Sequence, residues 1–375
     1  MTKRVCYVHV GPHKTGTTSI QWFLQESRAR LLEHGVFVPE SDTNHGAHHA
    51  VIGKLCGQDL GDRREALAVR AIKAIVETQC EAIVISSEAL EGTLKNRDQA
   101  RIFFNRIREL NLEPKLVLFP RNQSQWINSI YSSAVKTFRR SDSFKDFATA
   151  AAAARHRSLK FSSWIELADA HQIELIARPF TKQTIARGVV PEFLLAVEIS
   201  PSRFRDTELR RNEGAGPFTV GVAREVMRSL GIVDNGLKWL QAMRCKAKLA
   251  TYLGEKKLAD TGYCGLTTAM ARRIEEELRS DNDAFAQRVW RKPWAEIFTA
   301  DIREQFQPND FEICQPGWAI RKRLRRAVGE MKVMVRQILL DPSLGIEAPW
   351  NDLRKRSGLD FTTINLPVRS TRLAV

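Results

Sequence analysis

A short apolar segment near the amino terminus, Val5–Val10, leads directly into a loop that contains two glycines, Gly11 and Gly16. A run of apolar, largely β-branched residues without polar alternation is typical of a strand buried on both faces. The residues after the loop form an apolar side at helical spacing, with Ile20, Phe23, Leu24 and Leu31. A buried strand, a glycine loop and a helix over residues 17–32 predict the first unit of a parallel α/β sheet.

The same alternation continues along the first half of the chain. Strand-like segments lie at 82–86, 115–119 and 173–177, and helix-like segments lie at 101–110 and 123–136. From about Pro191 onward the pattern is mainly helical. We therefore predict a three-layer, P-loop-like α/β fold, in which a parallel sheet is flanked by helices and followed by helical C-terminal additions. We divide the chain into an α/β domain over residues 1–310 and a basic amphipathic extension over residues 311–375.

Composition places the chain among ordinary globular proteins. Of its 375 residues, 43% are apolar and 27% are charged, which is typical of neither a disordered nor a fibrous chain. The six cysteines are scattered without a CxxC pair, so we expect neither a disulfide framework nor a zinc site. No apolar run approaches the roughly 20 residues that span a bilayer, and the amino-terminal apolar segment is too short for a secretory signal. We expect a cytoplasmic protein.

The positive charge of the chain gathers toward its carboxyl end. The formal net charge is +15, and residues 317–375 carry twelve Lys and Arg against five Asp and Glu. Within them, the segment 320–339 has an apolar stripe of Leu324, Val328, Met331, Val335 and Ile338. We favour packing of this stripe on the body or on a second subunit, and keep peripheral contact with an anionic membrane as the alternative. Because the body lacks basic residues interleaved with stacking aromatics, we expect no nucleic-acid partner.

The loop after the first strand has the composition of an anion-binding site. Its candidate binding residues are Gly11, Lys14, Thr15, Gly16, Thr17 and Thr18. Backbone N–H groups and the amino terminus of the following helix converge on such a loop and favour an anion there. The glycines allow a tight turn, the threonines add hydroxyl donors, and Lys14 adds a fixed positive charge.

The position of the lysine separates this loop from that of nucleotide triphosphatases. Gly11 and Gly16 have the spacing of G-x-x-x-x-G-K-[ST], but Thr17 stands where the lysine is required. No apolar strand ends in an aspartate that would hold magnesium, so hydrolysis of ATP or GTP is disfavoured. A lysine inside the loop, at position 14, suits transfer of a sulfuryl group, because a cation there stabilises the oxygen that gains charge as the bond to sulfur breaks. That reaction needs no metal.

These residues carry a resemblance. The stretch GPHKTGTTSIQ resembles the 5′-phosphosulfate loop of the sulfotransferase family, especially its bacterial carbohydrate-modifying branch. In that family an arginine at the end of a buried strand and a serine eight residues on hold the 3′-phosphate, and Arg121 and Ser129 match them here. Weaker similarities are Ser86-Ser87-Glu88, Arg211-Asn212 and residues 280–287, so the resemblance covers roughly residues 3–310. It implies 3′-phosphoadenosine 5′-phosphosulfate as the donor.

Sulfuryl transfer also needs a base that removes a proton from the acceptor. In the family this base is a histidine or a glutamate, and the branch often carries a histidine pair after the first helix. His48 and His49 match that pair and are our leading candidates, because a neutral imidazole suits the role near neutral pH. Glu88, at the carboxyl end of a predicted strand, ranks just behind them. No cysteine or carboxylate stands at useful spacing from the histidines, so we predict no metal site.

We therefore expect a sulfotransferase that acts on a hydroxyl or amine of an acceptor, with a carbohydrate or glycoconjugate as the favoured class. Two alternatives stay open. One is a P-loop kinase that uses ATP and magnesium, and the other is a non-enzymatic protein that binds polyanions or membranes. Fold alone does not decide between them.

Overall fold

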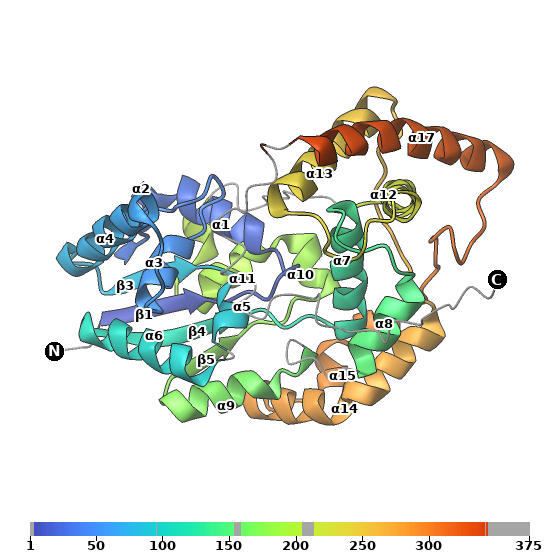
Figure 1. Ribbon diagram of the computed structural model, residues 1–375. Helices are drawn as coiled ribbons and strands as arrows, with labels where there is room; N and C mark the ends of the chain where they lie inside the picture. Colours follow the sequence, from blue (N-terminus) through green and yellow to red (C-terminus); the bar gives the residue numbers. More distant parts are fainter. Residues whose placement is uncertain (1–3, 95, 154–158, 205–213, 342, 344–375) are drawn as a thin grey trace.

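A five-stranded parallel sheet forms the centre of the protein (Figure 1). The computed structural model describes residues 4–94, 96–153, 159–204, 214–341 and 343. The strands are β1 (Arg4–His9), β2 (Val36–Phe37), β3 (Ala82–Ser86), β4 (Leu112–Leu118) and β5 (Glu174–Ala177), in the order β2-β3-β1-β4-β5. Helices cover both faces of the sheet, so the predicted three-layer α/β class is confirmed.

The central strand is β1, which pairs with β3 on one side and β4 on the other. Its register with β3 runs from Val5 opposite Ala82 to His9 opposite Ser86. On the other side, His9 lies opposite Val117 of β4. The carboxyl ends of the three strands therefore meet at one edge, where the loops that follow them lie side by side.

One face of the sheet is covered by α1 (Thr17–Glu26), α2 (Arg28–Glu33) and α11 (Val189–Ala196). Short elements flank them, namely α10 (Lys182–Arg187) and the 3-10 helix η2 (Pro201–Arg203). Tyr7 of β1, Phe23 of α1 and Phe193 of α11 belong to the same buried cluster. The apolar side predicted for the first helix thus packs on the sheet.

The opposite face is covered by a larger set of helices. These are α3 (His49–Leu55), α4 (Asp62–Glu77), α5 (Leu90–Thr93), α6 (Arg97–Glu109), α9 (Ser162–His171) and α14 (Thr268–Trp290), with the short α15 (Trp294–Ile297) and α16 (Thr299–Ile302) after it. Cys6 and Val8 of β1 share a cluster with Phe103 and Phe104 of α6. Alternate residues of β1 therefore enter different clusters, as the two-residue period of a strand requires.

The remaining helices form a second packed region beyond the carboxyl ends of the strands (Figure 1). They are α7 (Gln123–Lys136), α8 (Phe144–Ala153), α12 (Pro217–Ser229), α13 (Trp239–Glu255) and α17 (Trp318–Leu340). At their centre Arg224 forms a bidentate ion pair with Asp310, at 2.8 and 2.9 Å. The Tyr131 hydroxyl accepts from Arg224 at 3.0 Å, so the buried pair links α7, α12 and the segment before α17.

The basic amphipathic segment near the carboxyl end is the helix α17. Its residues Ala327, Met331, Val335 and Ile338 are buried in the same cluster as residues of α12 and α13. The prediction that this stripe packs on the body is therefore confirmed. Because this cluster continues from α7 into α17, residues 318–340 pack on the helices of the preceding region rather than apart from them.

The local differences from the predictions are small. The helix expected over residues 17–32 is two helices, α1 and α2, which meet at Ser27. The strand β2 was not predicted, since two residues carry no periodicity. None of the helices in the described ranges is both long and apolar enough to cross a membrane.

Candidate functional site

The loop between β1 and α1 turns through left-handed backbone at three residues. The φ angles are 93° at Gly11, 65° at Lys14 and 78° at Gly16. A Cβ at Gly16 would lie 2.7 Å from Cγ1 of Val189, so both the backbone angle and the packing of α11 require glycine there. Inside the loop, the Thr15 hydroxyl donates to the Pro12 carbonyl at 2.6 Å.

The amino terminus of α1 is open toward the loop. Its N-cap, Gly16, makes no side-chain cap hydrogen bond. The first N–H groups of a helix have no partner inside the helix and attract an anion or a cap. Thr17 is buried and Thr18 partly buried at this end. The predicted strand, glycine loop and helix start are thus adjacent, and anion binding by them stays a prediction.

Three hydrogen bonds join the loop to the segment after β4. The Arg121 guanidinium donates from Nη1 to the Lys14 carbonyl at 2.8 Å, and Trp126 donates from Nε1 to the His13 carbonyl at 2.7 Å. The Phe119 amide donates to the Gly11 carbonyl at 3.0 Å. The two candidate phosphate-binding elements, which are more than a hundred residues apart in the sequence, therefore form one site.

The Arg121 side chain has more hydrogen-bonding capacity than its neighbours use. It lies partly buried, with its guanidinium carbon 5.5 Å from the centre of the Phe180 ring. Its Nε is buried without a hydrogen-bond partner, and in the described part of the chain no carboxylate forms an ion pair with it. Burial lowers the pKa of Arg121 to about 10. The charges of Asp301 and Glu304 act on this pKa in the opposite direction, so they balance part of the Arg121 charge. A buried guanidinium whose charge is only partly balanced favours binding of a further anion.

Positive charges also crowd around Lys14. The pKa of Lys14 is lowered to about 8, first by burial and then by the charges of Lys136, Lys246 and Arg121, against a smaller opposite effect of Glu88. Lys136 ends α7 and Lys246 lies on α13. The pKa of Lys136 is lowered as well, by burial and then by Lys246. Like charges gathered in a partly buried site favour a ligand with several negative charges.

Sequence reasoning missed Lys136 and Lys246. Lys136 lies seven residues after Ser129 on α7, so the two share one side of that helix. This seven-residue spacing was the only feature of the sequence that could have placed Lys136 near the site. Nothing in the sequence connects Lys246 to the loop. Ser129 itself is partly buried in the middle of α7, and its carbonyl accepts from the Ser132 hydroxyl at 3.2 Å.

The two neighbouring histidines have different surroundings. His48 is 1% exposed, and both of its ring nitrogens bond to the backbone. Its Nε2 donates to the Pro39 carbonyl at 3.1 Å, and its Nδ1 accepts from the Ser86 amide at 3.1 Å. Burial lowers the pKa of His48 to about 4. In this arrangement His48 ties its loop to β3 and has no nitrogen left to accept a proton from a substrate.

His49 is partly buried, and its Nδ1 lies 2.6 Å from the Ser87 hydroxyl oxygen. That oxygen also accepts from the Ala89 amide at 3.2 Å. If Nδ1–H donates to Ser87, then Nε2 carries the lone pair that a general base needs. The serine therefore fixes the ring and can select the reactive tautomer.

Glu88 lies against the loop, with its Cβ 3.4 Å from the Cβ that a residue at Gly11 would have. Its carboxylate accepts from Gln21 Nε2 of α1 at 2.6 Å. Burial alone would raise the pKa of Glu88, but the charges of His49 and His13 and the bond from Gln21 outweigh it and hold the pKa at about 2. A carboxylate with so low a pKa is a weak base at neutral pH, and it is suited to stabilising a charged imidazole.

One weaker similarity of the carboxyl-terminal half has a structural counterpart. Asn282 of α14 is buried and donates from Nδ2 to Gln123 Oε1 at 3.1 Å, and Gln123 bonds back to Asn282. The pair fixes the start of α7, two residues after Arg121. The other similarity, Arg211-Asn212, lies outside the described residues.

The candidate site lies at the carboxyl edge of a parallel sheet and brings together the glycine loop with Lys14, the Arg121 guanidinium and the His49 ring held by Ser87. Across the described ranges, no group of three or more His, Cys, Asp or Glu side chains is placed to hold a metal ion. The fold places the chain in the α/β class, with a parallel sheet flanked by helices. No protein-family model, curated protein or solved structure matches the chain.

Proposed function

We propose that the protein is a sulfotransferase, which moves a sulfuryl group from 3′-phosphoadenosine 5′-phosphosulfate to a hydroxyl or amine of an acceptor. A carbohydrate is the favoured acceptor class. The observation that carries the proposal is the 2.8 Å hydrogen bond from Arg121 to the Lys14 carbonyl. It unites in one site the loop suited to a phosphosulfate and the arginine suited to a second phosphate.

The charges of the donor fit those of the site. The donor carries negative groups at both ends of its ribose phosphate unit. The loop and the amino terminus of α1 receive the phosphosulfate, while Arg121 and Ser129 receive the 3′-phosphate. Lys136 and Lys246 add positive charge close to Lys14, which a donor with several negative charges balances.

The chemical step follows from these positions. The acceptor oxygen or nitrogen attacks sulfur, a new bond to sulfur forms, and the bond from sulfur to the bridging oxygen breaks. The electron pair of that bond stays on the 5′-phosphate of adenosine 3′,5′-bisphosphate, where the Lys14 ammonium stabilises it. His49 removes the acceptor proton at Nε2, and the nearby carboxylate of Glu88 stabilises the imidazolium that forms.

A kinase that uses ATP and magnesium is the second candidate, and one observation favours it. Glu88 is ionised and lies against the loop just after β3, where a carboxylate is able to bind a magnesium–nucleotide complex. Against it, Thr17 occupies the position of the lysine that grips the β- and γ-phosphates. Turnover of the sulfuryl donor in EDTA, without turnover of ATP in magnesium, decides for the sulfotransferase.

We further propose a cytoplasmic location. All six cysteines are free thiols, two of them only partly buried and one exposed. Such thiols are typical of a reducing compartment. Nucleotide donors of this kind are also compatible with that compartment.

Calorimetric titration with adenosine 3′,5′-bisphosphate, the spent donor, tests the proposal. We expect binding to the wild-type protein, and about 10- to 100-fold weaker binding to Arg121→Ala, because a charged hydrogen bond to phosphate contributes about 1.5–3 kcal/mol. Adenosine 5′-monophosphate lacks the 3′-phosphate, so its weaker binding should change little in the same variant. This comparison separates loss of the phosphate contact from collapse of the loop that Arg121 supports.

Arg178→Ala is the matched control, since Arg178 follows the neighbouring strand β5 and its guanidinium donates to the Leu195 carbonyl at 3.4 Å. It should bind the bisphosphate like the wild type. Equal affinity of the wild-type protein for the bisphosphate and the monophosphate would contradict the proposal. So would an Arg121→Ala variant that binds both as the wild type does.

A further inference from the structure

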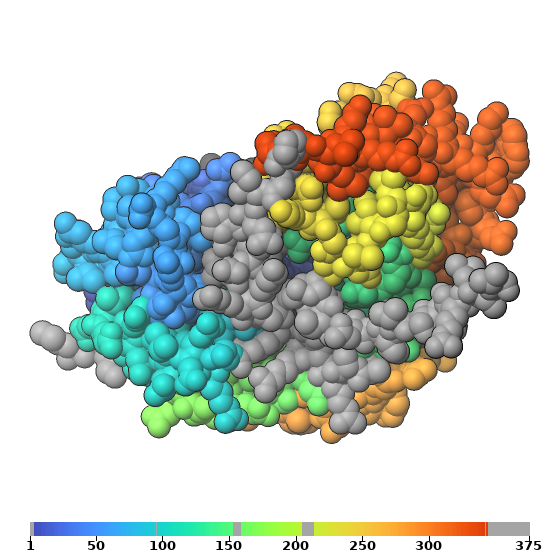
Figure 2. All heavy atoms as spheres, in the orientation of Figure 1, coloured from blue at the N-terminus to red at the C-terminus, as the bar shows by residue number. Residues whose placement is uncertain are grey.

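The outer side of α17 combines exposed apolar and basic residues. The helix buries Ala327, Met331, Val335 and Ile338 against α12 and α13, so its opposite side faces solvent. Figure 2 shows the helix along the upper edge of the molecule. On the solvent side the exposed fractions are 71% for Trp318, 56% for Val333 and 82% for Leu340. These three apolar side chains lie along the outer side of α17, from its first residue, Trp318, to its last, Leu340.

Basic residues lie between these apolar side chains. Around the outer side of the helix they are Arg321, Lys322, Arg325, Lys332 and Arg336. The single acidic residue of α17, Glu330, pairs with Arg326 at 2.8 Å. The Lys322 ammonium lies 5.1 Å from the centre of the Trp318 ring, so cation and aromatic ring occupy the same patch.

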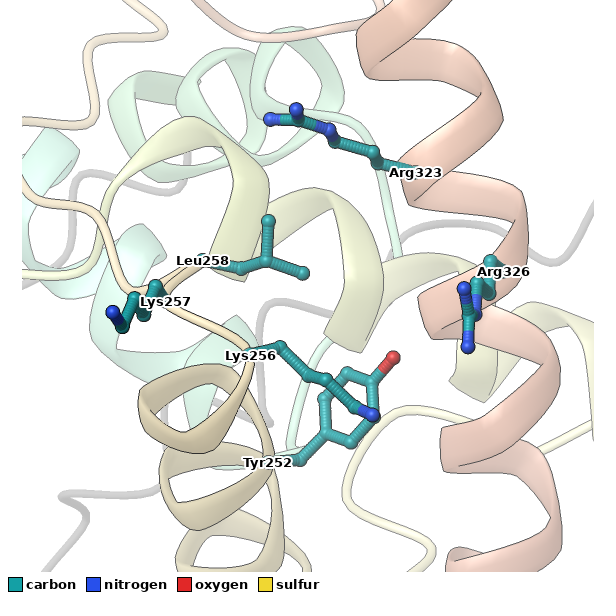
Figure 3. Close-up of a pocket in the computed structure, with 6 residues that line it drawn as sticks. All are labelled: Tyr252, Lys256, Lys257, Leu258, Arg323 and Arg326. Atoms are coloured by element: carbon teal, nitrogen blue, oxygen red, sulfur yellow. The ribbon is translucent and has the colours of Figure 1, made fainter.

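A cavity opens on the flank of this patch, between α17 and the end of α13 (Figure 3). It has a volume of about 420 Å³ and is lined by Tyr252, Lys256, Lys257, Leu258, Arg323 and Arg326. Four of the six lining residues are cations, and the carboxylate of Glu330 interacts with two of them, Arg326 and Lys256. The excess of positive charge fits one or two phosphate groups.

We propose that the surface formed by α17 and the end of α13 binds peripherally to an anionic lipid bilayer. Trp318, Val333 and Leu340 enter the boundary between headgroups and acyl chains, while the basic residues face lipid phosphates. The cavity receives a headgroup phosphate. An amphipathic helix with cations and a terminal tryptophan on its outer side is suited to lie in the plane of a membrane interface.

A lipid surface accounts for this patch better than two other occupants. A soluble polyanion such as a polysaccharide or a nucleic acid would use the cations but leave Leu340 and Val333 in water. The carboxyl-terminal residues 344–375 carry five Lys and Arg against three Asp and Glu, so their charge has the same sign as the patch. Only an anionic lipid surface complements both the charge and the apolar side chains.

Vesicle flotation with the full chain tests this inference, which does not depend on the proposed function. We expect the protein to bind vesicles of phosphatidylcholine mixed with phosphatidylglycerol and not to bind vesicles that contain only phosphatidylcholine. Binding to the anionic vesicles should weaken as the salt concentration rises. Each cation at an anionic surface contributes a factor of about five, so Lys322→Ala with Arg336→Ala should weaken binding about 25-fold. Lys145→Ala with Arg97→Ala removes one lysine and one arginine from other exposed helix positions and should have no effect.

Two further double variants separate a membrane from a soluble polyanion. Trp318→Ala with Leu340→Ala should weaken vesicle binding while binding to heparin stays unchanged. Lys256→Ala with Arg323→Ala should weaken binding to the anionic vesicles if headgroups enter the cavity. Equal binding to both kinds of vesicle would overturn the inference, as would unchanged vesicle binding by the Trp318 and Leu340 variant. The far-ultraviolet circular dichroism spectrum and the midpoint of thermal unfolding stay unaltered in every variant, which shows that each one is folded.

Discussion

We expect the buried positive charge of Lys14 to lower the stability of the folded protein. The pKa of Lys14 falls from the usual 10.5 to about 8, because the ammonium is buried and because Lys136, Lys246 and Arg121 surround it. A fall of roughly 2.5 units corresponds to about 3 kcal/mol, at about 1.36 kcal/mol for each unit. Lys14 is partly buried rather than enclosed, so solvent screening reduces this value. We expect Lys14→Met to raise the free energy of unfolding by about 1–3 kcal/mol.

The variant keeps the other features of the position. Methionine has a similar length, and it meets the same left-handed backbone at φ 65°, so the backbone strain does not change. At neutral pH, Lys14 is protonated in both the folded and the unfolded protein, so the full free-energy cost of holding its charge in the folded protein is present. Between about pH 8 and the ordinary pKa of lysine, the folded protein loses the proton first. The stability advantage of Lys14→Met should therefore shrink as the pH rises through this range.

Urea denaturation at several pH values measures this effect, and the same samples measure ligand binding. Adenosine 3′,5′-bisphosphate at a hundred times its Kd should stabilise the wild type by about 2.7 kcal/mol. At the same concentration it should stabilise Lys14→Met by about 0.4–1.4 kcal/mol, if loss of one charged contact weakens binding about 10- to 100-fold. Lys145→Met, at an exposed position of α8, is the control and should change stability by less than about 0.5 kcal/mol. A Lys14→Met variant that is less stable than the wild type would refute the reasoning. A stability gap that stays constant above pH 8 would refute it as well.

Two further predictions concern the histidine pair and the buried ion pair. His49→Ala should lower kcat by about 10²- to 10⁴-fold without changing bisphosphate binding. His48→Ala should mainly lower the thermal stability, because both ring nitrogens of His48 bond to the backbone. If both variants stayed folded and lost the same amount of kcat, these roles would be contradicted. Asp310→Asn should cost about 1.5–3 kcal/mol in urea denaturation, because buried Arg224 loses its bidentate carboxylate partner and retains Glu312, at 3.3 Å, as a counter-charge. The pKa of Asp310 is lowered, because the hydrogen bonds and charge of Arg224 outweigh the effect of burial. The ionised carboxylate therefore stabilises the folded protein at neutral pH, and this stabilisation is lost as the pH falls below the ordinary range of aspartate. If the wild-type protein and Asp310→Asn lost stability equally as the pH falls, this role of the Asp310 carboxylate would be disproved.

Much of the fold could be predicted because its signals are local. Four of the five strands come from short apolar runs, and α7 has the predicted bounds, Gln123–Lys136. The break at Ser27 and the strand β2 were missed, since neither has a composition that differs from its surroundings. The loop from Gly11 to Thr18 and Arg121 could be placed at one edge of the sheet for the same reason, since each follows a recognisable strand; their role in binding stays a prediction.

What the sequence by itself determined is the set of strands, the loop after β1 and the positions where binding residues follow strand ends. These depend on residues only a few positions apart, whose periodicity and backbone preferences are set by near neighbours. Only the tertiary structure decided that His48 bonds to the backbone while His49 meets Ser87, that Lys246 joins Lys14, and which side of α17 stays exposed. Each of these depends on contacts between distant segments, which exist only once the sheet and helices have packed together.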